Sequence, residues 1–172
     1  AGVRTVFIDF GYAEELRAVS NVRSPVLVRA FASVPREHFL GPGPWQILAP
    51  SETGRVAYRT TEDADPRHLY HNVLVAIDTS RRLHNGQPSA LALWIDSLDL
   101  QEGEHVVHIG CGVGYYTAIL VEVVGSAGHV TAIQLDPDLA ARARKNLSHV
   151  SHVDVLEGDG GSRVLVSPRL QG

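Results

Sequence analysis

Three glycines at alternating positions, Gly110, Gly112 and Gly114, are the most informative feature of this sequence. They follow a short apolar segment and precede a segment with helical spacing. Glycine allows a tight turn and lets a ligand lie against bare backbone N–H groups at a helix N-terminus. The arrangement predicts a nucleotide-binding turn at the carboxyl end of a strand.

The spacing of these glycines argues against a dinucleotide cofactor. In the dinucleotide fingerprint G-x-G-x-x-G the third glycine comes one residue later than Gly114 does here. A nicotinamide cofactor also favours an acid at the end of the following strand, where this chain has Gln134. A nicotinamide-dependent oxidoreductase is therefore the weakest of the functional hypotheses.

The elements that must position this turn alternate between strand and helix patterns. Asp136 followed by Pro137 is typical of a helix start. Because strands that alternate with helices form parallel sheets, the carboxyl ends of these strands should share one edge. The predicted strands are residues 106–109, 130–135 and 153–156, and the predicted helices between them are residues 115–124 and 137–147.

The chain before residue 85 is less regular. Ser24 followed by Pro25 predicts a helix start, and Pro35 ends that helix. Residues 50–70 are polar and fit no single element, whereas residues 72–78 have the composition of a short strand. A turn at Asn85-Gly86 and a helix over residues 88–98 lead into the regular part.

Composition excludes several classes of protein. Of 172 residues, 44% are hydrophobic and 20% charged, as in a soluble globular domain. A net charge of −4 argues against a general nucleic-acid surface, and no apolar stretch is long enough to cross a membrane. The single cysteine, Cys111, suits a reducing compartment. We therefore expect a cytoplasmic protein without a secretory signal and with neither nucleic acid nor membrane as partner.

Five segments together resemble the class I S-adenosylmethionine (SAM)-dependent methyltransferases, in particular the protein-L-isoaspartate O-methyltransferase family. The segment VVHIGCGVGYYTA resembles motif I in its G-x-G-x-G-Y-x-T-A form. The next strand and helix of the family resemble GHVTAIQLDPDLAARARKNL, and its GDG motif resembles VDVLEGDGG. Upstream, VRAFASVPREHFL and NGQPSALALWIDSLDLQEGE also match the family pattern. The resemblance covers residues 26–45 and 70–161 in the right order.

This resemblance implies a doubly wound, mostly parallel α/β sheet of the Rossmann-like methyltransferase type. Residues 1–84 would form a substrate-side segment and residues 85–172 the SAM-binding domain, with the C-terminal part of the family fold beyond this chain. The cofactor would be S-adenosyl-L-methionine. The reaction would transfer its methyl group to a carboxylate or hydroxyl oxygen of a protein, peptide or small-molecule acceptor.

The resemblance also implies site residues. The glycine turn would hold the methionine part of SAM, position 134 the ribose hydroxyls, and Asp159 the adenine amine. No catalytic residue and no metal ligand are assigned. The implied cofactor residues are His108, Gly110, Cys111, Gly112, Gly114, Tyr115, Gln134, Leu135, Asp159 and Gly160, and the implied substrate residues are Asn85, Gly86, Gln87 and Pro88.

This chain departs from the family pattern in four places. His108 stands where motif I usually has an acid, Gln134 replaces the acid that faces the ribose, and Gly86 replaces a serine. The chain also ends soon after the GDG motif. The fold expectation survives these departures, whereas the activity, and isoaspartate as its substrate, depend on them. A methyltransferase-fold binding module with weak or no catalytic activity is therefore the alternative hypothesis.

Several site residues have a second interpretation. His108 could be a core histidine, and Cys111 a small packing residue in a tight turn. Asp159 could form a turn, Asp136 could cap a helix or replace Gln134 at the ribose, and Asn85 could serve only its turn. The histidine pairs at positions 68/71 and 149/152 have a ligand-like spacing but no evident third ligand, so no metal site is expected.

The edge of the predicted sheet needs a neighbour. In the family fold the strand at 105–109 is central, and an unpaired apolar edge is a liability. Residues 163–167 (RVLVS) have strand character and are predicted to pair beside it. The remaining flank would be covered by the N-terminal residues or by a second copy in a homodimer. Because the acceptor side would stay incomplete, we expect weak or absent methyl transfer even when cofactor binds.

Overall fold

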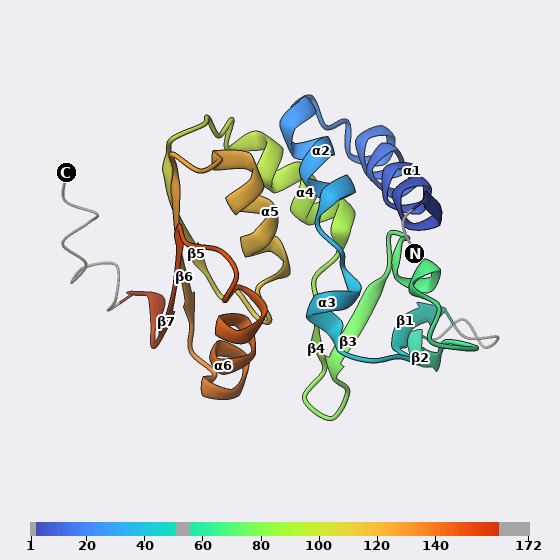
Figure 1. Cartoon of the computed structure of the whole chain (residues 1–172). Coiled ribbons are helices and arrows are strands. Elements are labelled where there is room, and N and C mark those ends of the chain that lie inside the picture. The colour runs from blue at the N-terminus through green and yellow to red at the C-terminus, as the bar shows by residue number, and fades with distance from the viewer. Residues whose placement is uncertain (1–2, 51–55, 162–172) are drawn as a thin grey trace. The chain divides into compact units, whose positions relative to one another are not determined.

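The computed structural model describes residues 3–50 and 56–161, which fall into two compact units, residues 1–99 and residues 100–172 (Figure 1). The boundary follows helix α4 (Pro88–Ser97), because α4 packs against helices of the first unit. The family resemblance predicts a functional boundary between residues 84 and 85, before α4. Within the described residues, no helix has both the length and the apolar character needed to cross a membrane.

In its described residues, 100–161, the second unit contains a parallel three-stranded sheet with order β5-β6-β7 (Figure 1). Its strands are β5 (His105–Ile109), β6 (His129–Gln134) and β7 (Val153–Glu157), and its helices are α5 (Tyr115–Val124) and α6 (Pro137–Asn146). Each element lies within two residues of its predicted bounds. The α/β class and the parallel arrangement that were predicted from the sequence are confirmed.

Register places both helices of this unit against one face of the sheet. His108, Ala132 and Val155 are aligned across the three strands, so their side chains share a face. His108 contacts Thr117 of α5, and Ala132 packs with Ala143 of α6. The predicted cap of α6 is confirmed, because Asp136 Oδ1 accepts the Leu139 N–H at 3.0 Å.

The described part of the first unit, residues 3–50 and 56–99, combines four α-helices with an antiparallel sheet of order β2-β1-β3-β4. The predicted short strand at 72–78 is present as β3, and the unassigned residues 50–70 contain β2 and a short 3-10 helix. This antiparallel sheet was not predicted. Besides α4, the elements are α1 (Val3–Ser20), α2 (Pro25–Ser33), α3 (Glu37–Leu40), β1 (Gln46–Pro50), β2 (Val56–Thr60), η1 (Pro66–Leu69), β3 (Leu74–Asp78) and β4 (Leu83–His84).

Helix α2 is fixed at its start by two side chains. Ser24 Oγ accepts the Leu27 N–H, which confirms the predicted cap. Asp96 of α4 is buried and accepts hydrogen bonds from the backbone N–H groups of Arg23 at 3.1 Å and Ser24 at 2.9 Å. Although burial alone would raise the pKa of Asp96, these hydrogen bonds and the Arg23 guanidinium hold it below its usual value.

Arg36 holds the short segment between η1 and β3 in place. It is completely buried, and its guanidinium donates to the carbonyl oxygens of Leu69 at 2.6 Å, His71 at 3.2 Å and Val73 at 2.9 Å. A buried charge is tolerated only where such hydrogen bonds replace water. This one residue therefore holds a segment without long regular structure in place.

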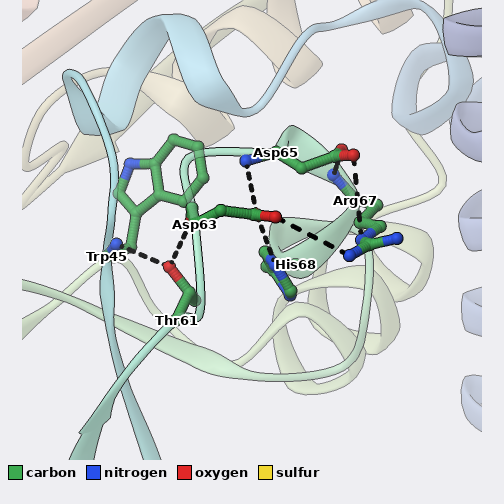
Figure 2. Close-up of polar contacts among 6 residues, drawn as sticks. All are labelled: Trp45, Thr61, Asp63, Asp65, Arg67 and His68. Atoms are coloured by element: carbon green, nitrogen blue, oxygen red, sulfur yellow. Dashed lines mark hydrogen bonds and ion pairs between the residues drawn. The ribbon is translucent and has the colours of Figure 1, made fainter.

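The loop after β2 is closed by its own polar groups, as Figure 2 shows. Thr61 Oγ1 accepts the Trp45 N–H at 3.0 Å and donates to the Asp63 carbonyl oxygen at 2.7 Å. His68 Nε2 lies within hydrogen-bond distance of Asp63 Oδ1, at 2.8 Å. His68 therefore serves this loop, whatever its ligand-like spacing from His71. The segment 163–167, predicted to pair beside β5, lies outside the described residues.

Candidate functional site

The three parallel strands end at one edge, and the backbone joins their ends there. Gly110 N–H donates to the Ile133 carbonyl oxygen at 2.8 Å, and Gly158 N–H donates to that of Gln134 at 3.0 Å. The glycine turn, the residues after β6 and the loop after β7 are thus brought together, as the sequence predicted. The carboxyl edge of a parallel sheet is where α/β proteins bind ligands.

The glycines of the turn have different structural reasons. All three have positive φ, at 77°, 58° and 94° for Gly110, Gly112 and Gly114, a conformation that disfavours any side chain. A Cβ atom at Gly110 or Gly112 would meet nothing within 4 Å, whereas one at Gly114 would lie 3.0 Å from Leu147 Cδ1. The first two glycines border open space that a ligand can fill, and the third allows α6 to pack against the turn.

Helix α5 begins directly after this turn. Gly114 is its N-cap residue and no side chain caps the helix, so the positive end of its dipole is directed to the turn. Tyr115 is 1% exposed and packs edge-on against Tyr116, with ring centroids 4.9 Å apart. This geometry supports a packing role for the Tyr115 ring, while its backbone remains at the site.

Two large apolar side chains are exposed at this edge. Ile109, the last residue of β5, is 58% exposed, and Leu135, which follows β6, is 70% exposed. Gly160 approaches Ile109 so closely that a Cβ atom there would lie 2.5 Å from Ile109 Cγ2. These two side chains offer an apolar surface to a ligand that binds at the turn. Leu135 was predicted, whereas Ile109 was missed although it directly precedes the first glycine.

Gln134 lies at the end of β6 and is almost fully buried. Its Oε1 accepts the Asp136 N–H at 3.2 Å, so the oxygen expected to face the ribose already has a backbone donor. Its Nε2 has no hydrogen-bond partner in the part of the chain that the structure describes, and it can donate to a ligand oxygen. Asp136 itself caps α6.

His108 joins β5 to α5. Its Nδ1 lies 2.9 Å from Thr117 Oγ1, and burial lowers its pKa from 6.5 to about 4. The ring is therefore neutral at physiological pH and fixes the helix that follows the turn. This contact supports the core interpretation, and a contact with cofactor stays a prediction. Thr117 was not singled out, although it belongs to the segment that resembles motif I.

Cys111 and Asp159 each have a local structural partner. Cys111 packs with Ala132 and Ala143, and burial raises the pKa of its thiol to about 11. The thiol is thus protonated and a poor nucleophile at neutral pH. Asp159 is exposed, and its Oδ1 accepts the Gly161 N–H at 3.2 Å, as in a turn. Their roles toward a cofactor stay predictions.

The predicted substrate residues belong to the first unit, whereas the glycine turn belongs to the second. Asn85 is buried, and its Nδ2 has no hydrogen-bond partner among the described residues. Gln87 donates from Nε2 to both oxygens of Asn72, so it anchors the segment. Gly86 has a φ of 78°, and Pro88 is the first residue of α4. Asn85 thus presents a buried polar group that no described residue uses.

Comparison with known proteins gives a consistent result. The family model for protein-L-isoaspartate(D-aspartate) O-methyltransferase matches residues 12–164. A curated protein-L-isoaspartate O-methyltransferase of Methanothrix thermoacetophila is 32% identical over 147 residues, which are 84% of this chain and 59% of that protein. A solved protein-L-isoaspartate O-methyltransferase is similar with a TM-score of 0.64 and 25% identity, over 86% of this chain and 42% of the other.

A second solved structure shows the same fold. It is a putative protein-L-isoaspartate O-methyltransferase from Plasmodium falciparum in complex with S-adenosyl-L-homocysteine, with a TM-score of 0.60 and 15% identity, over 94% of this chain and 66% of that one. The chain spans about half the length of the curated relatives it matches. The Rossmann-like methyltransferase fold expected from the sequence is confirmed.

Proposed function

The chain belongs to the protein-L-isoaspartate(D-aspartate) O-methyltransferase family, and on that premise we propose that it binds SAM at the carboxyl edge of β5, β6 and β7. The proposed reaction transfers the methyl group to a carboxylate oxygen of an isoaspartyl peptide or protein. The observation that carries the proposal is the glycine turn, whose first two glycines border open space beside the uncapped start of α5.

The residues at this edge suit such a cofactor. The turn offers backbone N–H groups to the methionine part, and Gln134 Nε2 offers a donor to a ribose oxygen. The exposed side chains of Ile109 and Leu135 can contact a flat apolar ring. In the proposal Asp159 faces the adenine amine. Gly160, which has no side chain, lets the loop after β7 lie close to Ile109. His108, through Thr117 of α5, and Cys111, through its packing against the core, stabilise the glycine turn.

When bound, SAM supplies a methyl group on a positively charged sulfur, an electrophile that needs no activation by the protein. A carboxylate acceptor is ionised at neutral pH and needs no general base. The protein's contribution is therefore positioning and exclusion of water. In this scheme Asn85 Nδ2, a buried donor with no partner in the described residues, donates to an acceptor oxygen.

The division of labour along the chain is part of the proposal. Residues 1–84, with the substrate residues Asn85 to Pro88 directly after them, would serve the acceptor, and the rest would serve the cofactor. A cytoplasmic location is also proposed, supported by the single cysteine of the chain, Cys111, which is buried and forms no disulfide. The acceptor would be a protein, a peptide or a small carboxylate.

Calorimetric titration of the purified protein with S-adenosylhomocysteine, SAM and NAD tests the cofactor. We expect the first two ligands to bind and NAD to give no heat of binding, because the third glycine comes too early for a dinucleotide. Tighter binding of NAD than of S-adenosylhomocysteine would overturn the proposal at its centre.

Replacing Gln134 by glutamate should strengthen cofactor binding. A carboxylate has two acceptor oxygens, so one can keep the Asp136 N–H while the other accepts from a ribose hydroxyl. The expected gain is on the order of 1 kcal/mol, because hydrogen bonds to charged groups are stronger. Gln46→Glu, an exposed position in the other unit, is the charge control. An unchanged affinity in Gln134→Glu would show that this side chain does not face the ribose.

Transfer of labelled methyl from SAM to an isoaspartyl peptide tests the reaction. The expected result is slow but measurable transfer that Asn85→Ala abolishes while S-adenosylhomocysteine still binds. Cofactor binding with no transfer by the unchanged protein would favour the alternative, a binding module of the same fold. Equal rates in Asn85→Ala and the unchanged protein would exclude the proposed role of Asn85.

A further inference from the structure

A groove of about 270 Å³ lies on the first unit between helices α1 and α2. One stripe of α1 and one stripe of α2 line it, because residues three or four positions apart share a helix face. None of its residues is among the proposed cofactor or substrate residues. The lining residues are Phe10, Glu14, Arg17, Arg23, Pro25, Val28 and Arg29.

The lining is unusual in its charge. Three guanidinium groups meet one carboxylate there, although the chain as a whole carries a net charge of −4. Arg17 pairs with Glu14 at 3.1 Å, where the Arg17 side chain is exposed and that of Glu14 is half-buried. Arg29 is exposed and makes no hydrogen bond or ion pair with any residue that the structure describes. The groove therefore has an excess of unused cationic donors.

The third guanidinium is only partly used. Arg23 binds Asp96 through Nε at 3.2 Å, and its side chain is 74% exposed. Asp96 offsets part of the charge of Arg23, so Arg29 is the guanidinium of the groove that has no acidic partner among the described residues. The two terminal nitrogens of Arg23 remain for a ligand, and a guanidinium fork matches the geometry of a carboxylate.

The rest of the lining is apolar. Phe10 is 57% exposed, and Pro25 and Val28 continue this surface between the arginines. The volume lies below the roughly 300–1,000 Å³ of pockets that enclose cofactors and drug-sized ligands. It suits one or two side chains of a peptide. An apolar surface framed by guanidinium groups selects a carboxylate next to an apolar side chain.

We propose that this groove binds a short acidic peptide segment in which carboxylate and apolar side chains alternate. Nucleic acid is the competing polyanion, but it would extend past the groove over a chain of net negative charge, which repels it. A short segment of a protein partner avoids that repulsion. The site goes beyond the proposed methyl transfer, and its occupancy does not require cofactor or catalysis.

Fluorescence anisotropy with a labelled peptide of alternating Asp and Leu tests the proposal on the full chain. We expect saturable binding that a matched peptide of alternating Asn and Leu lacks. Arg29→Ala should weaken binding roughly tenfold, since a charge-assisted hydrogen bond is lost. Arg59→Ala, an exposed arginine on β2 outside the groove, should leave the affinity unchanged. Both arginines are exposed, so both variants should fold, as circular dichroism would verify.

A second variant separates groove binding from attraction by charge alone. Phe10→Ser removes apolar lining without changing charge, and it should weaken the Asp–Leu peptide several-fold. Equal losses in Arg29→Ala and Arg59→Ala would overturn the proposal, as would equal affinity for the Asp–Leu and Asn–Leu peptides. Tighter binding of a labelled oligothymidylate than of the Asp–Leu peptide would assign the surface to nucleic acid instead.

Discussion

In the second unit β5 and β6 each lead into a turn and then into a helix that packs on the same sheet, whereas the first unit is assembled by contacts between distant segments. Arg36 bonds to carbonyl oxygens more than thirty positions away, and Asp96 reaches back to the start of α2. The two units therefore depend on contacts of different range: contacts between neighbouring elements in one, such as that of His108 with Thr117, and bonds between distant segments in the other. This difference can be tested by removing one residue of each kind.

The largest effect is expected at Arg36. Arg36→Met would leave the carbonyl oxygens of Leu69 and Val73 without their buried donor, at a cost of roughly 3–5 kcal/mol in the stability of the first unit. Both tryptophans, Trp45 and Trp94, lie in this unit, so tryptophan fluorescence during urea unfolding reports on it. Arg59→Met, at an exposed site, is the control and should change little.

Arg36→Lys keeps the charge but lacks the guanidinium fork, so an intermediate loss is expected. Such a variant remains informative if Arg36→Met does not fold. Stability equal to that of the unchanged protein in both variants would show that Arg36 is not what holds the segment between η1 and β3.

In the second unit the largest expected effect depends on pH and arises from His108. Its pKa is about 4 in the folded protein against 6.5 in the unfolded chain. Between these two pH values His108 is protonated in the unfolded chain and neutral in the folded unit. Stability is therefore fully present above pH 6.5 and is lost as the pH falls toward about 4, by up to roughly 3 kcal/mol.

His108→Asn should remove this part of the pH dependence while keeping an amide near Thr117 Oγ1. Urea unfolding followed by far-UV circular dichroism, near neutral pH and near the acid end of that range, measures it. His149→Asn is the matched control, because His149 is an exposed histidine of the same unit. An undiminished pH dependence in His108→Asn would show that other groups cause it.

The smallest effects are expected at the glycines, where two substitutions should separate two causes. Gly112→Ala adds only backbone strain, about 1–2 kcal/mol, because its Cβ enters open space. Gly114→Ala adds the same strain and a contact with Leu147 Cδ1 at 3.0 Å, so it should cost more. Gly112→Ala should nevertheless lower the affinity for S-adenosylhomocysteine by more, in free energy, than it lowers the stability of the fold. If Gly112→Ala were less stable than Gly114→Ala, the contact with Leu147 would not be what limits the residue at position 114.

The same contrast explains which parts could be predicted from the sequence. The elements of the second unit carry local signals, such as Gly110 to Gly114 before α5 and the Asp136-Pro137 start of α6. In the first unit, α1 gave no such signal, because its apolar residues do not form one stripe and Gly11 interrupts it. Residues 50–70 are polar because side chains such as Thr61 and Asp63 bond to the loop's own groups.

At the site, identities could be predicted better than roles. The positions of the glycine turn, Gln134 and Asp159 at one edge followed from parallel topology. The use of Gln134 Oε1 by a backbone N–H could not, because that bond depends on the local path of the chain after β6. Arg36 looks like an ordinary surface arginine in the sequence, and only the distant carbonyl oxygens around it reveal its role.

The third glycine ties the turn to the far end of α6. The Leu147 side chain lies against Gly114, and Asn146 Nδ2 donates to the Val113 carbonyl oxygen at 2.9 Å. A ligand that immobilises the turn therefore also restrains the last turn of α6 without touching it. The Leu147 N–H donates to the Ala143 carbonyl oxygen, with 2.9 Å between nitrogen and oxygen. Its hydrogen should exchange with solvent more slowly once cofactor is bound. Hydrogen exchange would thus report occupancy of the site from a helix end that lies outside it.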